Sequence, residues 1–283
     1  MRWLLILGVF ASLQAQNKQL LYGFKDVPQQ VFLNPGAQVD VRGFIGVPLL
    51  SQIHFNAGIT GFSAFDLFAD DGKDFSQKVS DIVYDLDAKD FFGINQQLDL
   101  FSVGFRLKTS SEKSIFISFG MYQESDIFFY FPKDYAVLVY EGNHNNLNRR
   151  FNLGDLSVSA EVLSVFHVGV NKKINPKLTL GLRGKIYSSI VQASSTNNTG
   201  SFTTVEGADN SLKHIFDLDM NLQISGLSFL EDSSTTNEFD VLKKRLLLGG
   251  NIGVGIDLGF TFEPAPEWTV DASIQDIGFI NYS

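Results

Sequence analysis

The chain has 283 residues, no cysteine and a formal net charge of −9. The absence of cysteine excludes disulfides, thiolate metal sites, a cysteine nucleophile and a lipid anchor on an N-terminal cysteine. The acidic balance argues against a nucleic-acid partner, because a phosphate backbone requires a basic protein surface. The 27 phenylalanines and 25 glycines are typical of strongly curved strands with an aromatic outer surface.

The N-terminus has the pattern of a cleaved export signal. Met1-Arg2 supplies the positive start, residues 3–13 form an apolar run, and Ala15 is a small residue before an expected cut at Gln16. The run is too short to cross a membrane as a helix, and no later segment offers about 18 consecutive apolar residues. The sequence therefore predicts an exported protein without a transmembrane helix.

The clearest element is a long β-hairpin between residues 157 and 190. Apolar side chains occupy one parity and mainly polar ones the other on both sides of the turn at 172–176. Period-2 alternation places the two sets on opposite faces of a strand. Soluble strands usually sustain it for about 5–6 residues. Here it runs about twice as far, which is the length that a tilted strand needs to cross a bilayer.

The same alternation recurs along the chain. It is found at 53–60, 101–107, 115–122, 216–224, 251–262 and 268–275, and more weakly at 39–47. Short connections (48–52, 108–113, 172–176, 263–266) alternate with long ones (63–97, 124–156, 192–213). Short turns on one side and long loops on the other are typical of outer-membrane barrels. Within the first long connection, apolar residues at helical spacing predict a short amphipathic helix over 75–86.

Consecutive strands of a barrel should run in opposite directions, and the predicted strands break this rule once. Either one upward crossing is missing between 225 and 248, with 239–248 as the better candidate, or residues 201–206 pair with the strand near Phe216. The nine or ten strands also do not close, so we expect an incomplete barrel that continues beyond the chain end.

Three segments resemble FadL-type outer-membrane barrels. Residues 23–36, which end in Asn34-Pro35-Gly36, resemble the "NPA" entry segment of those barrels, with Gly36 where alanine is common. The hairpin 168–181 and the pair 253–259 and 268–279 are similar to the same barrels. Together they resemble an uncharacterised outer-membrane family of the Bacteroidota (domain of unknown function 5723), related to FadL and to PorV- and PorP-type secretion components. The resemblance implies an N-terminal segment that folds into the lumen as a hatch.

The alternation predicts an all-β fold, an antiparallel transmembrane β-barrel, and the resemblance implies that it is FadL-like. Together they give three regions. Residues 1–15 form the signal peptide, 16–38 a hatch-like segment, and 39–283 the barrel domain, located in the cell outer membrane.

Four titratable residues are predicted to share the lumen face of the long hairpin: Glu161, His167, Arg183 and Lys185. A turn centred near Asn175 would place His167 opposite Arg183. The set is either a site for an acidic or polar solute or a charge ladder that fills a small interior, and the ladder is favoured. Carboxylates on other lumen faces could balance the positive charges: Asp217, Asp219 and Asp257.

No catalytic, cofactor or metal site is predicted. The four histidines have no nucleophile or metal spacing, and no glycine-flanked serine elbow is present. Residues 70–74 resemble a calcium turn but lack the full ligand alternation, so a solvated acidic loop is favoured. A barrel enzyme is the least expected function.

Two functions remain open. The first is a porin-like channel or transporter for small hydrophobic or amphipathic solutes, as the FadL resemblance implies. The second is a structural or adaptor barrel that binds the proteins of a secretion or surface-assembly complex. A lateral opening in the wall, or a continuous lumen with an apolar pocket, would favour transport. A plugged lumen with apolar external loops, for which residues 128–131 and Tyr135 are candidates, would favour the adaptor. Outer-membrane lipid is a partner in both.

Overall fold

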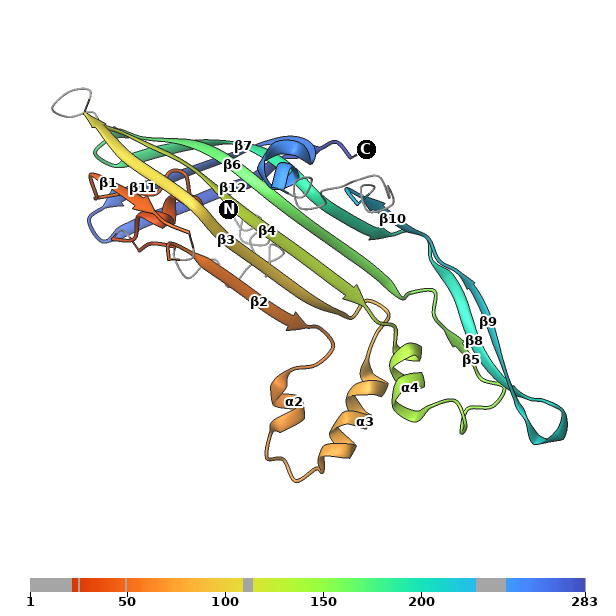
Figure 1. Ribbon diagram of the computed structural model, residues 1–283. Helices are drawn as coiled ribbons and strands as arrows, with labels where there is room; N and C mark the ends of the chain where they lie inside the picture. Colours follow the sequence, from red (N-terminus) through yellow and green to blue (C-terminus); the bar gives the residue numbers. More distant parts are fainter. Residues whose placement is uncertain (1–21, 25, 49, 109–113, 228–242, 283) are drawn as a thin grey trace, which may run out of the picture.

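The computed structural model describes residues 22–24, 26–48, 50–108, 114–227 and 243–282. The expected export signal and the first residues of the hatch-like segment lie outside these ranges. Within them, twelve strands form two antiparallel sheets, which we call the main sheet and the arm (Figure 1). The prediction of an all-β antiparallel fold is confirmed.

The main sheet contains nine strands. They are β1 (Gly43–Gly46), β2 (Ile53–Ile59), β3 (Phe91–Lys108), β4 (Ser114–Tyr130), β6 (Ser157–Asn175), β7 (Leu178–Ser195), β10 (Leu222–Ser225), β11 (Asn251–Ala265) and β12 (Trp268–Ile280). The order is β1-β3-β4-β6-β7-β11-β12, with β2 also on β3 and β10 also on β7. The hairpin expected from the alternation is β6 and β7, which are 19 and 18 residues long.

The arm contains β5 (Arg150–Asn152), β8 (Thr199–Glu206) and β9 (Leu212–Asp219), in the order β5-β8-β9. It projects beyond the end of the main sheet, past the end of β7 (Figure 1). The described residues also form six short helical segments: η2 (Pro28–Phe32) before the first strand, and α2 (Ala64–Phe68), α3 (Phe75–Asp85), α4 (Lys133–Glu141), η3 (Ala208–Asn210) and η5 (Arg245–Gly249) between strands. In the part of the chain described, no helix is long and apolar enough to span a membrane.

The helix predicted over 75–86 is confirmed as α3. Its first turn is stabilised by Asp74, whose side chain accepts a hydrogen bond from the Gln77 amide at 2.9 Å. Asp71 forms an ion pair with Lys78 at 2.8 Å. The acidic loop 70–74 therefore caps and anchors this helix.

The apparent gap in strand direction has a simple cause. Residues 199–206 do pair with 212–219, but in the arm. Strand β10 then pairs with residues 192–195 of β7, and β11 continues along the same edge at 178–189. The two segments act as one interrupted strand, so no further crossing is required. The strand expected over 239–248 is wrong for its described part, because residues 245–249 form η5.

The strands also run further into the expected loops than predicted. Strand β3 begins at Phe91 and β4 ends at Tyr130. Residues 128–130 therefore belong to a paired strand, with Phe129 opposite Phe92, and only Tyr135 of the aromatic set lies on a helix, α4. The prediction of an external aromatic loop was therefore wrong for residues 128–130, because the alternation there continues in register with β3, whereas Phe131 follows the strand.

The main sheet curls around the N-terminal segment. Arg106 of β3 donates to the Val39 carbonyl, whereas Gln275 of β12 donates to the Phe32 carbonyl at 3.0 Å. These two strands lie near opposite ends of the strand order, so a segment this short can contact both only if the sheet is strongly curved. In the part of the chain described, β1 and β12 do not pair with each other, and the sheet is open.

The two faces of the main sheet differ in chemistry. On β7, Leu180 and Leu182 are 43% and 50% exposed on the outer face, whereas Arg183 is 2% exposed on the concave face. The same division holds on β11, where Ile256 is exposed and Asp257 is fully buried. The predicted alternation is confirmed, with apolar residues outward and polar residues inward.

The arm is anchored by a small apolar cluster. Val137 of α4 and Phe151 of β5 are fully buried, and they pack with Leu153 and Phe202. The cluster is separate from the concave face of the main sheet, so the arm has its own source of stability.

We expect Phe151→Ala to destabilise the arm by about 3–5 kcal/mol, because it leaves a cavity among fully buried side chains. Hydrogen exchange should rise over residues 133–141 and 199–219 and stay unchanged in β4, β6 and β7. Phe65→Ala, at a residue that is 76% exposed, is the matched control. Uniform loss of protection across both sheets would contradict a separate cluster.

Candidate functional site

The predicted Asn34-Pro35-Gly36 motif lies directly against the backbone of two strands. A Cβ atom on Gly181 of β7 would overlap the Pro35 carbonyl, and one on Gly259 of β11 would overlap the Asn34 side chain. A Cβ on Gly36 would in turn overlap the backbone of Gly259. Only glycine permits backbones to approach this closely. The segment therefore docks through shape at three glycines.

Side chains of the main sheet donate hydrogen bonds to the carbonyls of this segment. Asn171 Nδ2 of β6 reaches both the Pro35 and the Ala37 carbonyl at 2.7 Å. Ser273 Oγ of β12 reaches the Leu33 carbonyl at 2.8 Å. In the other direction, the side-chain Nδ2 of Asn34 donates to the Phe260 carbonyl of β11 at 3.1 Å. An irregular buried segment has no strand ladder, so its carbonyls need such donors.

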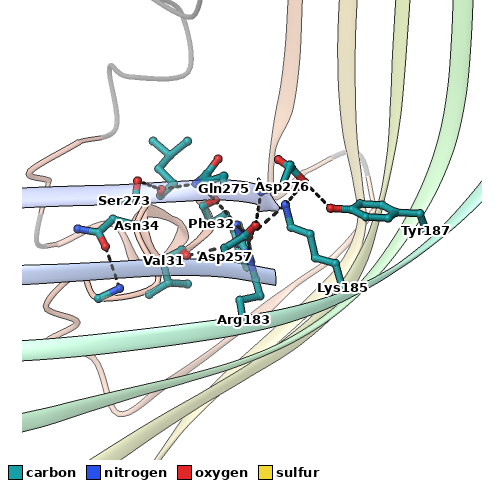
Figure 2. A network of polar contacts seen from close by, with 12 residues as sticks. Val31, Phe32, Asn34, Arg183, Lys185, Tyr187, Asp257, Ser273, Gln275 and Asp276 are labelled. Carbon is teal, nitrogen blue, oxygen red and sulfur yellow. Dashed lines mark hydrogen bonds and ion pairs between the residues drawn. The ribbon is translucent and has the colours of Figure 1, made fainter. Parts of the chain in front are cut away.

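A charged cluster lies beside the docked segment (Figure 2). Asp257 of β11 contacts Arg183 at 2.5 Å and Lys185 at 3.1 Å, both on β7. Lys185 also contacts Asp276 of β12 at 2.6 Å, and Tyr187 donates to the same carboxylate at 2.7 Å. Two cations and two carboxylates balance, and this neutrality is what allows charges to lie inside a protein.

Arg183 joins the cluster to the hatch-like segment. Its Nε donates to Asp257 at 2.6 Å, while its Nη2 donates to the Phe32 carbonyl at 2.7 Å. The guanidinium can do both because its five donors form a rigid planar fork. Figure 2 shows this arrangement, with Phe32 and Gln275 beside the Arg183–Asp257 pair.

A β-bulge brings Asp276 to the concave side. Ile256 faces Ile277 and Leu258 faces Ile274, so Asp257 lies opposite two residues, Gln275 and Asp276. Asp276 has a φ of 58°, a left-handed conformation that Asp and Asn tolerate better than other side chains. Its amide donates to Asp257 Oδ1 at 2.7 Å. The extra residue reverses the parity of β12, so Asp276 points inward.

The four predicted lumen residues do not form one cluster. Arg183 and Lys185 both belong to the charged cluster around Asp257. His167 on β6 faces Lys185 on β7, not Arg183 as expected. The register of β6 and β7 differs from the expected one for two reasons. The turn is tight, with Asn175 facing Leu178, and the register shifts between Lys173 and Asn175, next to the turn. The His167 ring packs against Phe32 and is 3% exposed.

Glu161 lies outside the cluster. It is six residues from His167 along β6, which corresponds to about 20 Å of strand, and it accepts a hydrogen bond from Tyr282. Of the carboxylates expected to balance the cations, Asp257 does so. Asp217 and Asp219 lie on β9 in the arm, where Asp217 is 3.7 Å from Arg150.

Sequence reasoning missed Asp276, Tyr187 and Gln275. A signal for the bulge does exist: the outward apolar residues of the last strand have even numbers up to Ile274 and odd numbers from Ile277. Such a parity change indicates an inserted residue. No comparable signal marks Asn171 as a donor to the hatch-like segment.

The arrangement can hold a polypeptide segment in place, and its charged groups already have partners. In the described ranges, no group of three or more His, Cys, Asp or Glu side chains is arranged to bind a metal ion. The Arg183–Asp257–Lys185–Asp276 cluster with its hatch contacts is therefore best described as an anchoring site.

A family profile described as "Family of unknown function (DUF5723)" matches residues 35–283, and the chain belongs to this family. The match begins at Pro35, within the docked motif, and includes every strand of both sheets. Neither the curated proteins nor the solved structures contain a significant match.

We expect Gly181→Ala to displace the docked segment, because the new methyl group would occupy the position of the Pro35 carbonyl. In an Ala37→Cys background, maleimide labelling of the otherwise cysteine-free chain should accelerate by at least about tenfold, since Ala37 is 5% exposed when docked. Gly184→Ala on the same strand has nothing within 4 Å of its Cβ and is the matched control. Equal labelling of both variants would contradict backbone docking.

We expect Asp257→Asn to destabilise the protein by about 3–5 kcal/mol, because it leaves Arg183 and Lys185 buried with one carboxylate fewer. The urea midpoint of unfolding measures this loss. Asp85→Asn, on the exposed surface of α3, should change the midpoint little. A similar midpoint for both variants would show that Asp257 does not compensate the two cations.

Proposed function

We propose that this chain is an outer-membrane protein of β-barrel type whose interior is plugged by its own N-terminal segment, and that it acts as a structural or adaptor component of a surface-assembly complex. The observation that carries the membrane location is the division of the main sheet into two faces. Leu182 and Ile256 are exposed on one face, while the charges of Arg183 and Asp257 are buried on the other. A soluble protein rarely exposes so extensive an apolar surface, whereas acyl chains would cover it.

The plugged interior favours an adaptor over an open channel. The hatch-like segment occupies the concave face near the tight turns, and the cavity beside it, between Gln30 and Asp271, has a volume of only about 100 Å³. Exposed aromatic side chains lie instead on the connecting helices, where Phe65, Phe68 and Phe75 are 76%, 75% and 58% exposed. Such residues are typical of surfaces that bind another protein.

Transport of small hydrophobic solutes is the second candidate, and one feature favours it. An apolar groove of about 340 Å³ lies on the outer face between Leu180, Leu258 and Ile274. Gly181 and Gly259 also line it, and these are the glycines against which the hatch-like segment docks. A hydrophobic solute in this groove would be separated from that segment by the strand backbone alone.

We expect Leu182→Arg to impair insertion, because an arginine on a lipid-facing strand costs about 2–4 kcal/mol at the membrane midplane. The yield of protease-resistant protein after refolding into phospholipid vesicles should fall by at least about tenfold. Val139→Arg, on the exposed surface of α4, should leave the yield unchanged. Equal yields, or a soluble folded monomer without detergent, would rule out the membrane location.

The two functions are separated by flux measurements on the full chain in vesicles. An adaptor with a plugged interior should increase neither sugar-driven vesicle swelling nor the entry of a fluorescent fatty acid. Fatty-acid entry that Gly181→Ala changes and Gly184→Ala does not would favour transport.

A further inference from the structure

The outer edge of the arm is an unpaired β-strand. Among the residues described, β9 pairs with β8 alone, and all eight of its residues are exposed. Phe216, at its centre, packs on Phe202 on one side, yet 64% of its surface is exposed. An edge of this length, without proline or bulge, is a template for another strand.

The hydrogen-bonding pattern shows which residues of β9 point their backbone N–H and C=O groups toward the free edge. The Gly207 amide donates to the Ser211 carbonyl at 2.8 Å where the hairpin closes. Residue pairs of an antiparallel ladder alternate between bonded and non-bonded. Odd-numbered residues from Lys213 onward therefore bond to β8. The amides and carbonyls of Leu212, His214, Phe216 and Leu218 point to the free edge.

The two ends of β9 carry charges of opposite sign. Lys213 lies near its start, and Asp217 and Asp219 lie near its end. Asp217 is close to Arg150 within the arm. In the described ranges, Lys213 and Asp219 belong to no ion pair.

This order of charges is self-complementary when two copies of β9 pair in antiparallel orientation. If Phe216 faces Phe216 of a second copy, Lys213 lies opposite Asp219 at both ends of the contact. Both residues of each bonded pair are then even-numbered, as the free edge requires. His214 faces Leu218 on the apolar side. A pairing that places Phe216 opposite an odd-numbered residue would set its outward-pointing amide against a residue whose backbone groups are already bonded to β8, so the geometry excludes it.

We propose that β9 is a docking edge for a second copy of this chain, which joins the two arms into one continuous antiparallel sheet with a two-fold axis at Phe216. A foreign strand would need the opposite order of charges, whereas a second copy supplies it by symmetry. The axis is perpendicular to β9, and the arm projects beyond the main sheet (Figure 1), so the two main sheets lie at opposite ends of the pair.

For a membrane-embedded main sheet, such a pair would connect two facing membranes. This consequence rests on the function proposed above, whereas the pairing itself does not. The following experiment uses the full chain in detergent, so that a failure of pairing is distinguishable from a failure of membrane insertion.

Cross-linking tests the register, because the chain contains no cysteine. In the proposed pair the two Phe216 Cα atoms lie about 5.5 Å apart, within the range of a disulfide. Mild oxidation of Phe216→Cys should therefore give a covalent dimer. Ile215→Cys is the matched control, since its side chain points to the other face and lies opposite Asp217. Equal cross-linking of the two variants, or none for Phe216→Cys, would overturn the proposal.

Charge reversal tests the pairing without altering Phe216. Lys213→Asp or Asp219→Lys alone turns two attractive pairs into repulsive ones and should weaken self-association by about tenfold in sedimentation. The double variant K213D/D219K restores both pairs and should recover the association of the native chain. Single variants that associate normally would overturn the proposal. A double variant as weak as the single ones would do so too, once its circular dichroism shows native folding.

Discussion

The Arg183–Asp257 ion pair is the contact on which the interior of this protein depends. It connects β7 to β11, and the same guanidinium holds the carbonyl of Phe32 in the hatch-like segment. Removing the Asp257 carboxylate would leave Arg183 buried without this partner, and removing Arg183 would leave Asp257 with Lys185 alone. The pair therefore links the curvature of the main sheet to the docking of the segment that it surrounds.

Glycine has a complementary role at the same place. Gly181 and Gly259 lie on the two strands that carry the ion pair, and their missing side chains create the space for Asn34-Pro35-Gly36. Polar donors then satisfy the carbonyls that this close approach buries. The docked segment is thus positioned both by shape at the glycines and by hydrogen bonds to its carbonyls.

The two sheets solve different problems. The main sheet keeps charge on its concave side and apolar side chains on its outer side, as a lipid-facing wall requires. The arm has a separate apolar cluster around Phe151, and within the described part of the chain its last strand is paired along one edge only. The proposed contacts with other molecules therefore involve different surfaces: lipid is proposed on the main sheet, and protein on the helices and the arm.

The sequence by itself determined the strands, their faces and the amphipathic helix α3, because period-2 and helical alternation are local properties of the chain. It also marked Asn34-Pro35-Gly36 and placed His167, Arg183 and Lys185 on one face. Only the tertiary structure decided which of these residues meet. The register shift beside the turn paired His167 with Lys185, and the bulge at Asp276 brought a second carboxylate inward. Glu161 lies six residues from His167 along β6, too far to join them. The diversion of β8 and β9 into the arm was equally hidden, because alternation identifies a strand but does not identify its neighbour. Register and partner choice arise from contacts between distant residues, and those contacts exist only once the chain has folded.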